Sequence, residues 1–229
     1  MKRFYKAVTT IEHPEGHGLA LDGRPVKTPA RLPLLVPTAQ LAQAIADEWR
    51  AQEQEIRPET MPLTGLANAA IDRIAPDTAT FAAGLAAFAE SELLAYRAEF
   101  PDDLVARQAA VWDPLLAWAR QRYDVAFTVT TGILHKPQPA ATLARMLAAF
   151  AAYDPFRLAA LNHAVTISGS AVIALALAEA HIDADQAWHA GQLDELWQTE
   201  KWGRDPLVEA GWADKRKSLD AAERLLRLL

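Results

Sequence analysis

Up to Pro37 the chain alternates short apolar runs with turn-forming residues, a pattern typical of a small β-rich region. Asp22 and Gly23 separate two of these runs. A tight hairpin turn favours this pair, because both of its central positions require a positive φ. The pattern therefore predicts a β-hairpin here.

A helical period begins at Thr38, whose hydroxyl side chain suits the N-cap of a helix. A helix that starts there would place four residues on one side: Leu41, Ile45, Glu48 and Trp49. We expect Trp49 to be structural and to pack this first helix onto the β-rich region.

Beyond Ile74 the chain is rich in Ala and Leu and is predicted to be mostly helical, with breaks at segments that contain Asp or Pro. The pair Asp113-Pro114 predicts an N-cap followed by the first helical residue, so a new helix would start at Leu115. Residues 125–131 alternate like a strand. The predicted fold class is α+β. A small β-rich α+β domain covers residues 1–75, and a mainly α-helical domain covers residues 76–229.

The longest apolar run, Ala171–Ala178, is far shorter than the roughly 20 residues that a membrane span requires. Its apolarity on all sides predicts a central buried helix, with Ser168 as its cap. The C-terminal segment predicts an amphipathic helix that docks on the helical domain. Its apolar stripe consists of Leu219, Ala222, Leu226 and Leu229.

The composition is that of a globular protein, with 229 residues, 51% of them hydrophobic. The net charge is −6 and no basic run stands clear of acidic residues, which argues against a nucleic-acid partner. Cysteine is absent, which excludes disulfides, thiol nucleophiles and thiolate metal sites. No apolar signal segment follows the first basic residues, so we expect a mature protein of the bacterial cytoplasm without membrane insertion.

Motifs for a metal, a cofactor or a catalytic nucleophile are missing from the sequence. His13 and His17 have the spacing of two ligands on a helix, but Pro14 and Gly16 between them indicate a turn. The chain has no P-loop, no GxGxxG and no GxSxG. We therefore predict no metal, no cofactor and no catalytic residue.

The pattern places Glu92 in the middle of an apolar helix face. A continuous helix over residues 80–97 brings it within about 80° of four large side chains: Phe81, Leu85, Phe88 and Tyr96. A carboxylate in that position requires a partner, because burial disfavours its charged form. One interpretation is a structural ion pair with Arg107 or Arg73, and the other is a catalytic acid with a raised pKa.

The stretch DELWQTEKWGRD, residues 194–205, sets two tryptophans among charged residues. On a helix Trp197 lies near Leu193, whereas Trp202 lies near Glu195 and about 140° away from Trp197. One tryptophan can therefore enter the core while the other faces elsewhere. An aromatic side chain with a polar rim is typical of a protein-binding hot spot. The alternative is that Gly203 ends the helix and Trp202 folds onto the same molecule.

Seven segments, in order along nearly the whole chain, resemble the ATP-twelve family of assembly chaperones. They read KRFYKAV, LDGRPVKTP, PTAQLAQAIADEWRAQ, MPLTGLANAAID, ESELLAYRAEFPDDLVARQAAVWDPLLAW, SGSAVIALAL and LDELWQTEKWGRD. The resemblance implies an N-terminal α+β domain, a C-terminal helical domain and no catalytic activity. It also implies a partner, the free alpha subunit of the F-type ATP synthase catalytic head, which the chaperone shields until a beta subunit takes its place.

The resemblance also implies roles for residues. Partner-binding roles fall to Asp194, Glu195, Lys201 and Trp202, where the family's acidic C-terminal motif matches. From the residues themselves we expect structural roles for Trp49, Glu92, Trp112, Asp113 and Trp197. The family commonly has Asp and Cys where this chain has Glu92 and Ala95, a change that keeps the carboxylate.

Two other functions are open from the sequence. One is a small hydrolase that uses a carboxylate pair including Glu92, which requires Glu92 to meet solvent near a second acid. The other is a scaffold that recognises exposed strands or helices of many partners. We expect a monomer, and we expect eukaryotic relatives in the mitochondrial matrix.

Overall fold

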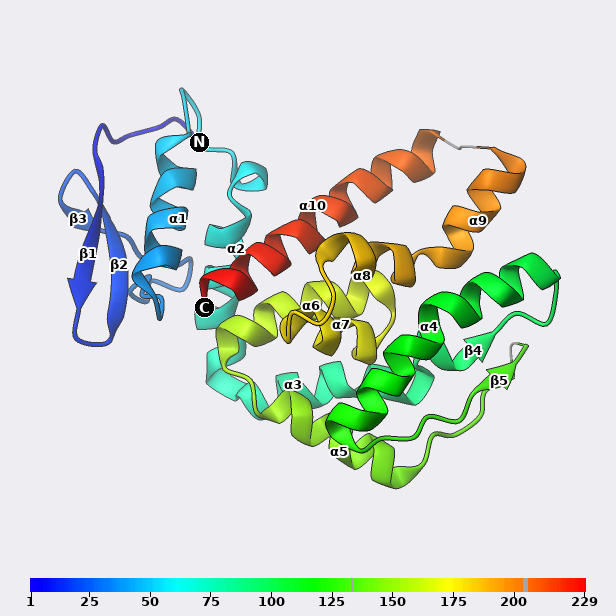
Figure 1. Ribbon diagram of the computed structural model, residues 1–229. Coiled ribbons are helices and arrows are strands. Elements are labelled where there is room, and N and C mark those ends of the chain that lie inside the picture. The colour runs from blue at the N-terminus through cyan, green and yellow to red at the C-terminus, as the bar shows by residue number, and fades with distance from the viewer. Residues whose placement is uncertain (133, 204–205) are drawn as a thin grey trace. The chain divides into compact units, whose positions relative to one another are not determined.

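The computed structural model describes residues 1–132, 134–203 and 206–229, without the side chains of residues 206–210. Within these ranges the chain divides into two units. One contains Met1–Thr78, Asp154–Ala160 and Arg224–Leu229, and the other contains Ala79–Tyr153 and Leu161–Glu223. The predicted α+β class is confirmed, because a small N-terminal sheet precedes a mostly helical remainder (Figure 1).

The first unit begins with an antiparallel sheet of order β1-β2-β3, formed by β1 (Val8–His13), β2 (Gly16–Leu21) and β3 (Arg24–Pro25). The predicted hairpin is confirmed at the turn between β2 and β3, where Asp22 has φ 49° and Gly23 has φ 79°. β2 buries its C-terminal half and forms the central strand.

Helix α1 (Ala39–Arg50) packs on this sheet and buries Leu41 and Ile45 completely. The predicted N-cap is confirmed, since the Thr38 hydroxyl oxygen accepts a hydrogen bond from the Leu41 N–H. The same hydroxyl donates to the backbone oxygen of Leu228, 2.5 Å away, so one side chain joins the start of α1 to the end of the chain.

Helix α2 (Pro62–Ala69) begins at the carboxylate of Glu48, which comes from the last turns of α1. The two Glu48 oxygens accept hydrogen bonds from the backbone N–H groups of Leu63 and Thr64, and one also accepts from the Thr64 hydroxyl. Burial raises the pKa of Glu48, while these hydrogen bonds oppose that rise. Glu48 thus supplies the N-terminal cap of a helix other than its own.

The rest of the chain is mostly helical. Its helices are α3 (Thr78–Ala86), α4 (Asp102–Tyr123), α5 (Ala140–Ala151), α6 (Pro155–Ser168), α7 (Ala171–Ala178), α8 (Ala184–Gly191), α9 (Leu193–Trp202) and α10 (Pro206–Leu228). Short helical turns occupy Pro58–Thr60, Ala70–Ile74, Ala75–Asp77, Ala87–Ser91 and Leu93–Ala95. Two short strands, β4 (Tyr96–Arg97) and β5 (Thr130–Thr131), pair in parallel.

Helix α7 lies in the core of the second unit. Every residue from Ala171 to Leu177 is buried, and the helix packs against α4 and α8 (Figure 1). The prediction that Ser168 caps this helix is wrong. Ser170 is the N-cap and accepts from the Ile173 N–H, whereas the Ser168 hydroxyl donates to the Ala164 oxygen of the preceding helix. A serine next to a glycine-containing turn can satisfy either helix, and sequence alone does not decide which.

Two further helix predictions are wrong. The continuous helix over residues 80–97 ends at Ala86, and the chain leaves helical geometry at Glu92, where ψ is 118°. Helix α4 does not restart at Pro114 but runs through it. Proline removes one helical hydrogen bond, and the complete burial of Trp112 beside it offsets that loss.

The strand predicted over residues 125–131 is reduced to β5, at its C-terminal end. The apolar stripe predicted for the last helix is confirmed at Leu219 and Ala222, which are buried in α10, but its next buried leucine is Leu225 rather than Leu226. No helix in the described part of the chain is long and apolar enough to cross a membrane.

Candidate functional site

Helix α9 carries all four residues predicted to bind a partner. It follows α8, whose start is fixed by a capping box between Asp183 and Gln186, and it ends at Gly203, where φ is 91°. The helix thus ends at Gly203, as the alternative interpretation of this stretch held. Leu193 and Trp197, four residues apart, are buried on one side of α9.

Polar contacts hold α9 on the N-terminal half of α4. The Gln108 amide donates to Asp194 at 2.8 Å, and the Arg107 guanidinium pairs with Glu200 at 2.9 Å. Asp103 accepts from Lys201 at 2.8 Å and from the indole N–H of Trp197 at 3.2 Å.

These contacts give two of the predicted partner-binding residues roles inside the molecule. Asp194 and Lys201 both bind side chains of α4. The hydrogen bond from Lys201, followed by that from Trp197, lowers the pKa of Asp103. In the same way the hydrogen bond from Arg107 lowers the pKa of Glu200. The contacts therefore favour the charged carboxylates that fix α9.

Glu195 and Trp202 face outward. The Trp202 side chain is 75% exposed, whereas Trp197 is 7% exposed, so the predicted division between a buried and an exposed tryptophan is confirmed. Glu195 is also exposed, and because seven residues make nearly two helical turns, it lies on the same face of α9 as Trp202.

The two indole rings nevertheless touch, which corrects the expectation that they diverge. Their centroids lie 5.7 Å apart in an edge-to-face arrangement. The angle of about 140° describes only the directions of the two Cα–Cβ bonds. Tryptophan side chains are long enough for their rings to meet at the surface of the helix in spite of that angle. Trp197 thus supports the exposed ring of Trp202 from below.

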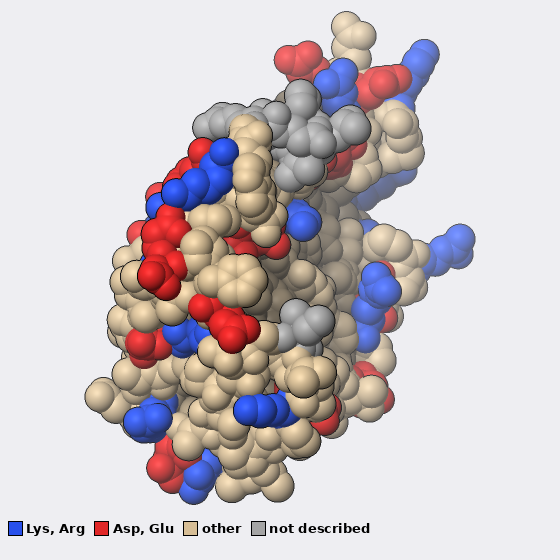
Figure 2. Space-filling view, turned by 90° about the vertical axis from the view of Figure 1, so that its right-hand side faces the viewer, with Lys and Arg blue, Asp and Glu red and all other residues tan. Residues whose placement is uncertain are grey.

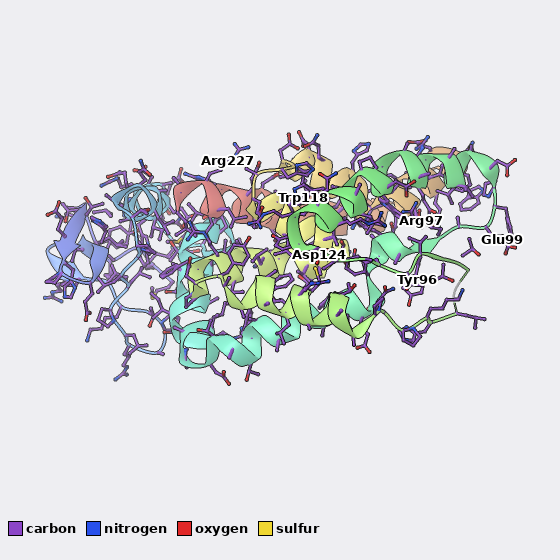
Figure 3. All side chains as sticks on the ribbon, turned by 60° about the horizontal axis from the view of Figure 1, so that its bottom comes forward. Tyr96, Arg97, Glu99, Trp118, Asp124 and Arg227 are labelled. Atoms are coloured by element: carbon purple, nitrogen blue, oxygen red, sulfur yellow. The ribbon has the colours of Figure 1, made fainter. Side chains whose placement is uncertain are left out.

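Trp112 and Asp113 lie in the middle of α4. Trp112 is buried, and its indole N–H donates to the backbone oxygen of Ala190 at 2.8 Å. The expectation that Asp113 caps a helix is wrong, because it pairs with Arg97 at 2.7 Å. In Figure 3, Arg97 lies beside the helices, whereas Glu99 lies at the outer end of the loop that leads to α4.

Glu92 is fully buried, with 0% exposure, but the ion pair predicted for it is wrong. Arg107 binds Glu200 instead. The Glu92 carboxylate accepts hydrogen bonds from the backbone N–H groups of Leu94, Ala171 and Val172 at 3.0–3.3 Å. It therefore caps the buried N-terminus of α7, as Glu48 caps α2. Burial raises the pKa of Glu92 to about 7.

This position does not meet the condition for a hydrolase built on Glu92, which requires that the carboxylate reach solvent. In the described ranges no group of three or more His, Asp and Glu side chains could hold a metal ion.

A pocket of about 530 Å³ lies between α4 and α8, and its walls are mostly apolar.

Sequence reasoning missed the side chains of α4 that receive α9. Asp103 and Arg107 follow the i,i+4 spacing of one helix face, and Gln108 lies about 100° from Arg107 around the helix. The spacing marks a face of α4 but does not identify its partner. It also missed that Glu48 caps a second helix, because the contact joins residues far apart in sequence.

Comparison with known proteins gives consistent results. Residues 2–120 match the family model described as ATP12 chaperone protein. The protein named "Protein atp12, mitochondrial" from Schizosaccharomyces pombe is 26% identical over 216 residues, which cover 88% of this chain and 74% of that protein.

Solved structures agree over almost the full length. Atp12 from Paracoccus denitrificans is 40% identical, with a TM-score of 0.95 over 99% of this chain and 97% of that chain, and a point mutant of the same protein matches equally well at 39% identity. The Atu1473 protein from Agrobacterium tumefaciens is 40% identical with the same TM-score, over 99% of this chain and 85% of that chain. On these matches, the chain belongs to the ATP12 chaperone family.

Proposed function

We propose that the chain is an assembly chaperone for the catalytic head of the F-type ATP synthase. It binds the free alpha subunit and covers the surface that a beta subunit later occupies. Membership of the ATP12 chaperone family supports the general role. The alpha subunit as client follows from the resemblance of the chain to that family.

The observation that carries the proposal is the exposure of Trp202. A tryptophan that is 75% exposed leaves a large apolar area in water, and exposed apolar area of this kind marks interaction surfaces. Trp202 is also held in place, because Trp197 supports its ring and α9 is fixed on α4 by Asp103, Arg107 and Gln108. A fixed aromatic ring loses little conformational entropy on binding.

The chemistry of this surface suits a temporary cover. A subunit that awaits its partner exposes an interface of obligate size, ~2,000 Å² or more, and such a surface promotes aggregation. A chaperone must bind it and then leave. An aromatic anchor sets the dissociation rate, while charges at the rim, such as Glu195, mainly set the rate of encounter.

The test is a reconstitution with purified proteins. The chain is mixed with isolated alpha subunit, and complex formation and light scattering are followed before and after beta subunit is added. We expect an equimolar complex that suppresses aggregation and that beta subunit displaces. If alpha subunit aggregates as fast as it does alone, the proposed client is wrong.

A further inference from the structure

A second large aromatic side chain is exposed next to the helix that receives α9. Phe100 lies in the loop between β4 and α4 and is 76% exposed, as much as Trp202. A phenylalanine side chain cannot form a hydrogen bond with water. Its exposure therefore does not stabilise the isolated chain. Figure 2 looks onto the side where α9, β4 and β5 lie, and there acidic and basic side chains are interspersed among uncharged ones.

The loop that carries Phe100 is tied to α9 by a single buried amide. Gln108 is 1% exposed; its side-chain oxygen accepts from the Ala98 N–H at 2.8 Å, and its nitrogen donates to Asp194 of α9 at 2.8 Å. Asp103, on the other side of Phe100 in the chain, binds Lys201. The loop and the helix are therefore held as one rigid part of the second unit.

Chain geometry then limits how far apart the two aromatic residues lie. Through Asp103 and Lys201, their Cα atoms are at most roughly 25–30 Å apart. A standard interface covers about 800 Å² on each partner, which is about 30 Å across. Both rings therefore fit within one interface of ordinary size.

The charges around the two rings are predominantly negative. Residues 99–107 and 194–202 together contain six acidic and two basic side chains, a net charge of −4 in a chain whose total is −6. Both basic side chains, Arg107 and Lys201, bind acidic partners within the molecule. A partner that covers this area therefore binds more favourably if lysine or arginine lies next to the apolar residues that contact the two rings.

We propose that Phe100 and Trp202 are two anchors of one binding surface, and that its occupant is an apolar segment of the client flanked by Lys or Arg. We call this the Phe100–Trp202 surface and define it by Glu99, Phe100, Asp102, Glu195 and Trp202. The inference rests on the proposed chaperone function and names the chemistry of the client segment.

The test compares four proteins for binding to isolated ATP synthase alpha subunit: the unchanged chain, Phe100→Ser, Trp202→Ser and Phe4→Ser. Phe4 is the matched control, because it is 65% exposed and lies in the other unit. We expect each change at the surface to weaken binding at least tenfold and the control to have no effect. If Trp202→Ser weakens binding but Phe100→Ser binds as well as the unchanged chain, Phe100 is not an anchor. That result would overturn this inference and leave the proposed function unchanged.

A charge arm uses Glu99→Lys, with Glu53→Lys as the control, since both residues are exposed acids and both changes alter net charge equally. We expect Glu99→Lys to slow association severalfold and to weaken its salt dependence, and Glu53→Lys to do neither. Equal effects of the two variants would overturn the role of local charge.

A peptide arm separates this inference from the identity of the client. Two synthetic peptides share one apolar segment, flanked in one by lysines and in the other by glutamates. We expect the lysine peptide to bind the unchanged chain and to lose binding to Phe100→Ser. If the lysine peptide behaves in this way but alpha subunit does not bind, the surface stands and the proposed client fails. If the glutamate peptide binds equally well, the stated chemistry is wrong.

Discussion

Lys201 binds Asp103 at 2.8 Å, so the side chain of Lys201 faces α4. The four residues of α9 that were predicted to bind a partner therefore form two groups. Lys201 and Asp194 face α4 and hold the helix, whereas Glu195 and Trp202 face outward. Four residues that are close in sequence therefore have two different tasks. The first group fixes the position of α9, and the second group is available to a partner.

Gln108 provides the first prediction, because it joins the loop before α4 to α9. Gln108→Ala leaves the Ala98 N–H and the Asp194 carboxylate without this partner, and we expect the free energy of unfolding to fall by about 1–3 kcal/mol. Gln43→Ala, at an exposed position of α1, is the control and should change it by less than about 0.5 kcal/mol. Urea unfolding measures both, and equal stabilities of the two variants would contradict the bridging role.

Glu92 predicts a pH-dependent stability. Its pKa in the folded chain is about 7, above the ordinary 4.5, so the folded state binds more protons than the unfolded state between these values. The contribution of Glu92 to stability is thus fully present below pH 4.5 and is lost as pH rises through about 7, a change of roughly 2–4 kcal/mol.

Glu92→Gln cannot titrate, so we expect its stability to fall less than that of the unchanged chain between pH 5 and pH 7.5. Glu48 also has a raised pKa and is present in both proteins, so the difference between them isolates Glu92. Glu90→Gln, at an exposed neighbouring position, should retain the full slope. Identical slopes for the Glu92→Gln and unchanged proteins would show that Glu92 does not titrate in this range.

Trp49 tests the structural role assigned to the first helix. Its ring lies 5.6 Å from that of Tyr5, whose hydroxyl donates to the Trp49 backbone oxygen, and its indole N–H is buried without a hydrogen-bond partner. Trp49→Arg replaces the ring packing by a charge, and we expect a loss of about 2–4 kcal/mol. Trp49→Phe removes the unsatisfied N–H and should cost less than about 1.5 kcal/mol. A soluble Trp49→Arg protein with an unchanged Tm would refute this assignment.

A change at Glu195 tests in cells whether the outward face of α9 binds the client. Glu195→Lys reverses a rim charge at an exposed position, so the fold should be unchanged while assembly of the ATP synthase is lost. The measurement is the yield of assembled enzyme in cells that carry only the variant, with circular dichroism to check folding. A normal yield would remove Glu195 from the binding surface.

The elements that sequence predicted correctly depend on short-range signals. Thr38 caps the residues that follow it, and Asp22 and Gly23 have the positive φ that their turn needs. In each case the chemistry lies within a few residues. The fold class followed from the same signals, because strand and helix periods are local.

Several errors occurred where a distant residue decides the structure. Glu92 satisfies the start of a helix almost eighty residues away, and the packing of Trp112 carries α4 through Pro114. The roles of Asp194 and Lys201 likewise depend on side chains of α4. Periodicity indicates that a residue is buried or exposed, but it does not identify the residue that it meets.

The most direct test of the central claim is site-specific photocrosslinking from position 202. A photoreactive phenylalanine analogue replaces Trp202 in one protein and Leu147, an exposed residue of α5, in another, and each is mixed with isolated alpha subunit. The proposed function predicts a crosslink to alpha subunit from position 202 alone, and this crosslink does not form when beta subunit is added before irradiation. Crosslinking that is absent at 202, or equal at 202 and 147, would contradict the claim that this face of α9 binds the client.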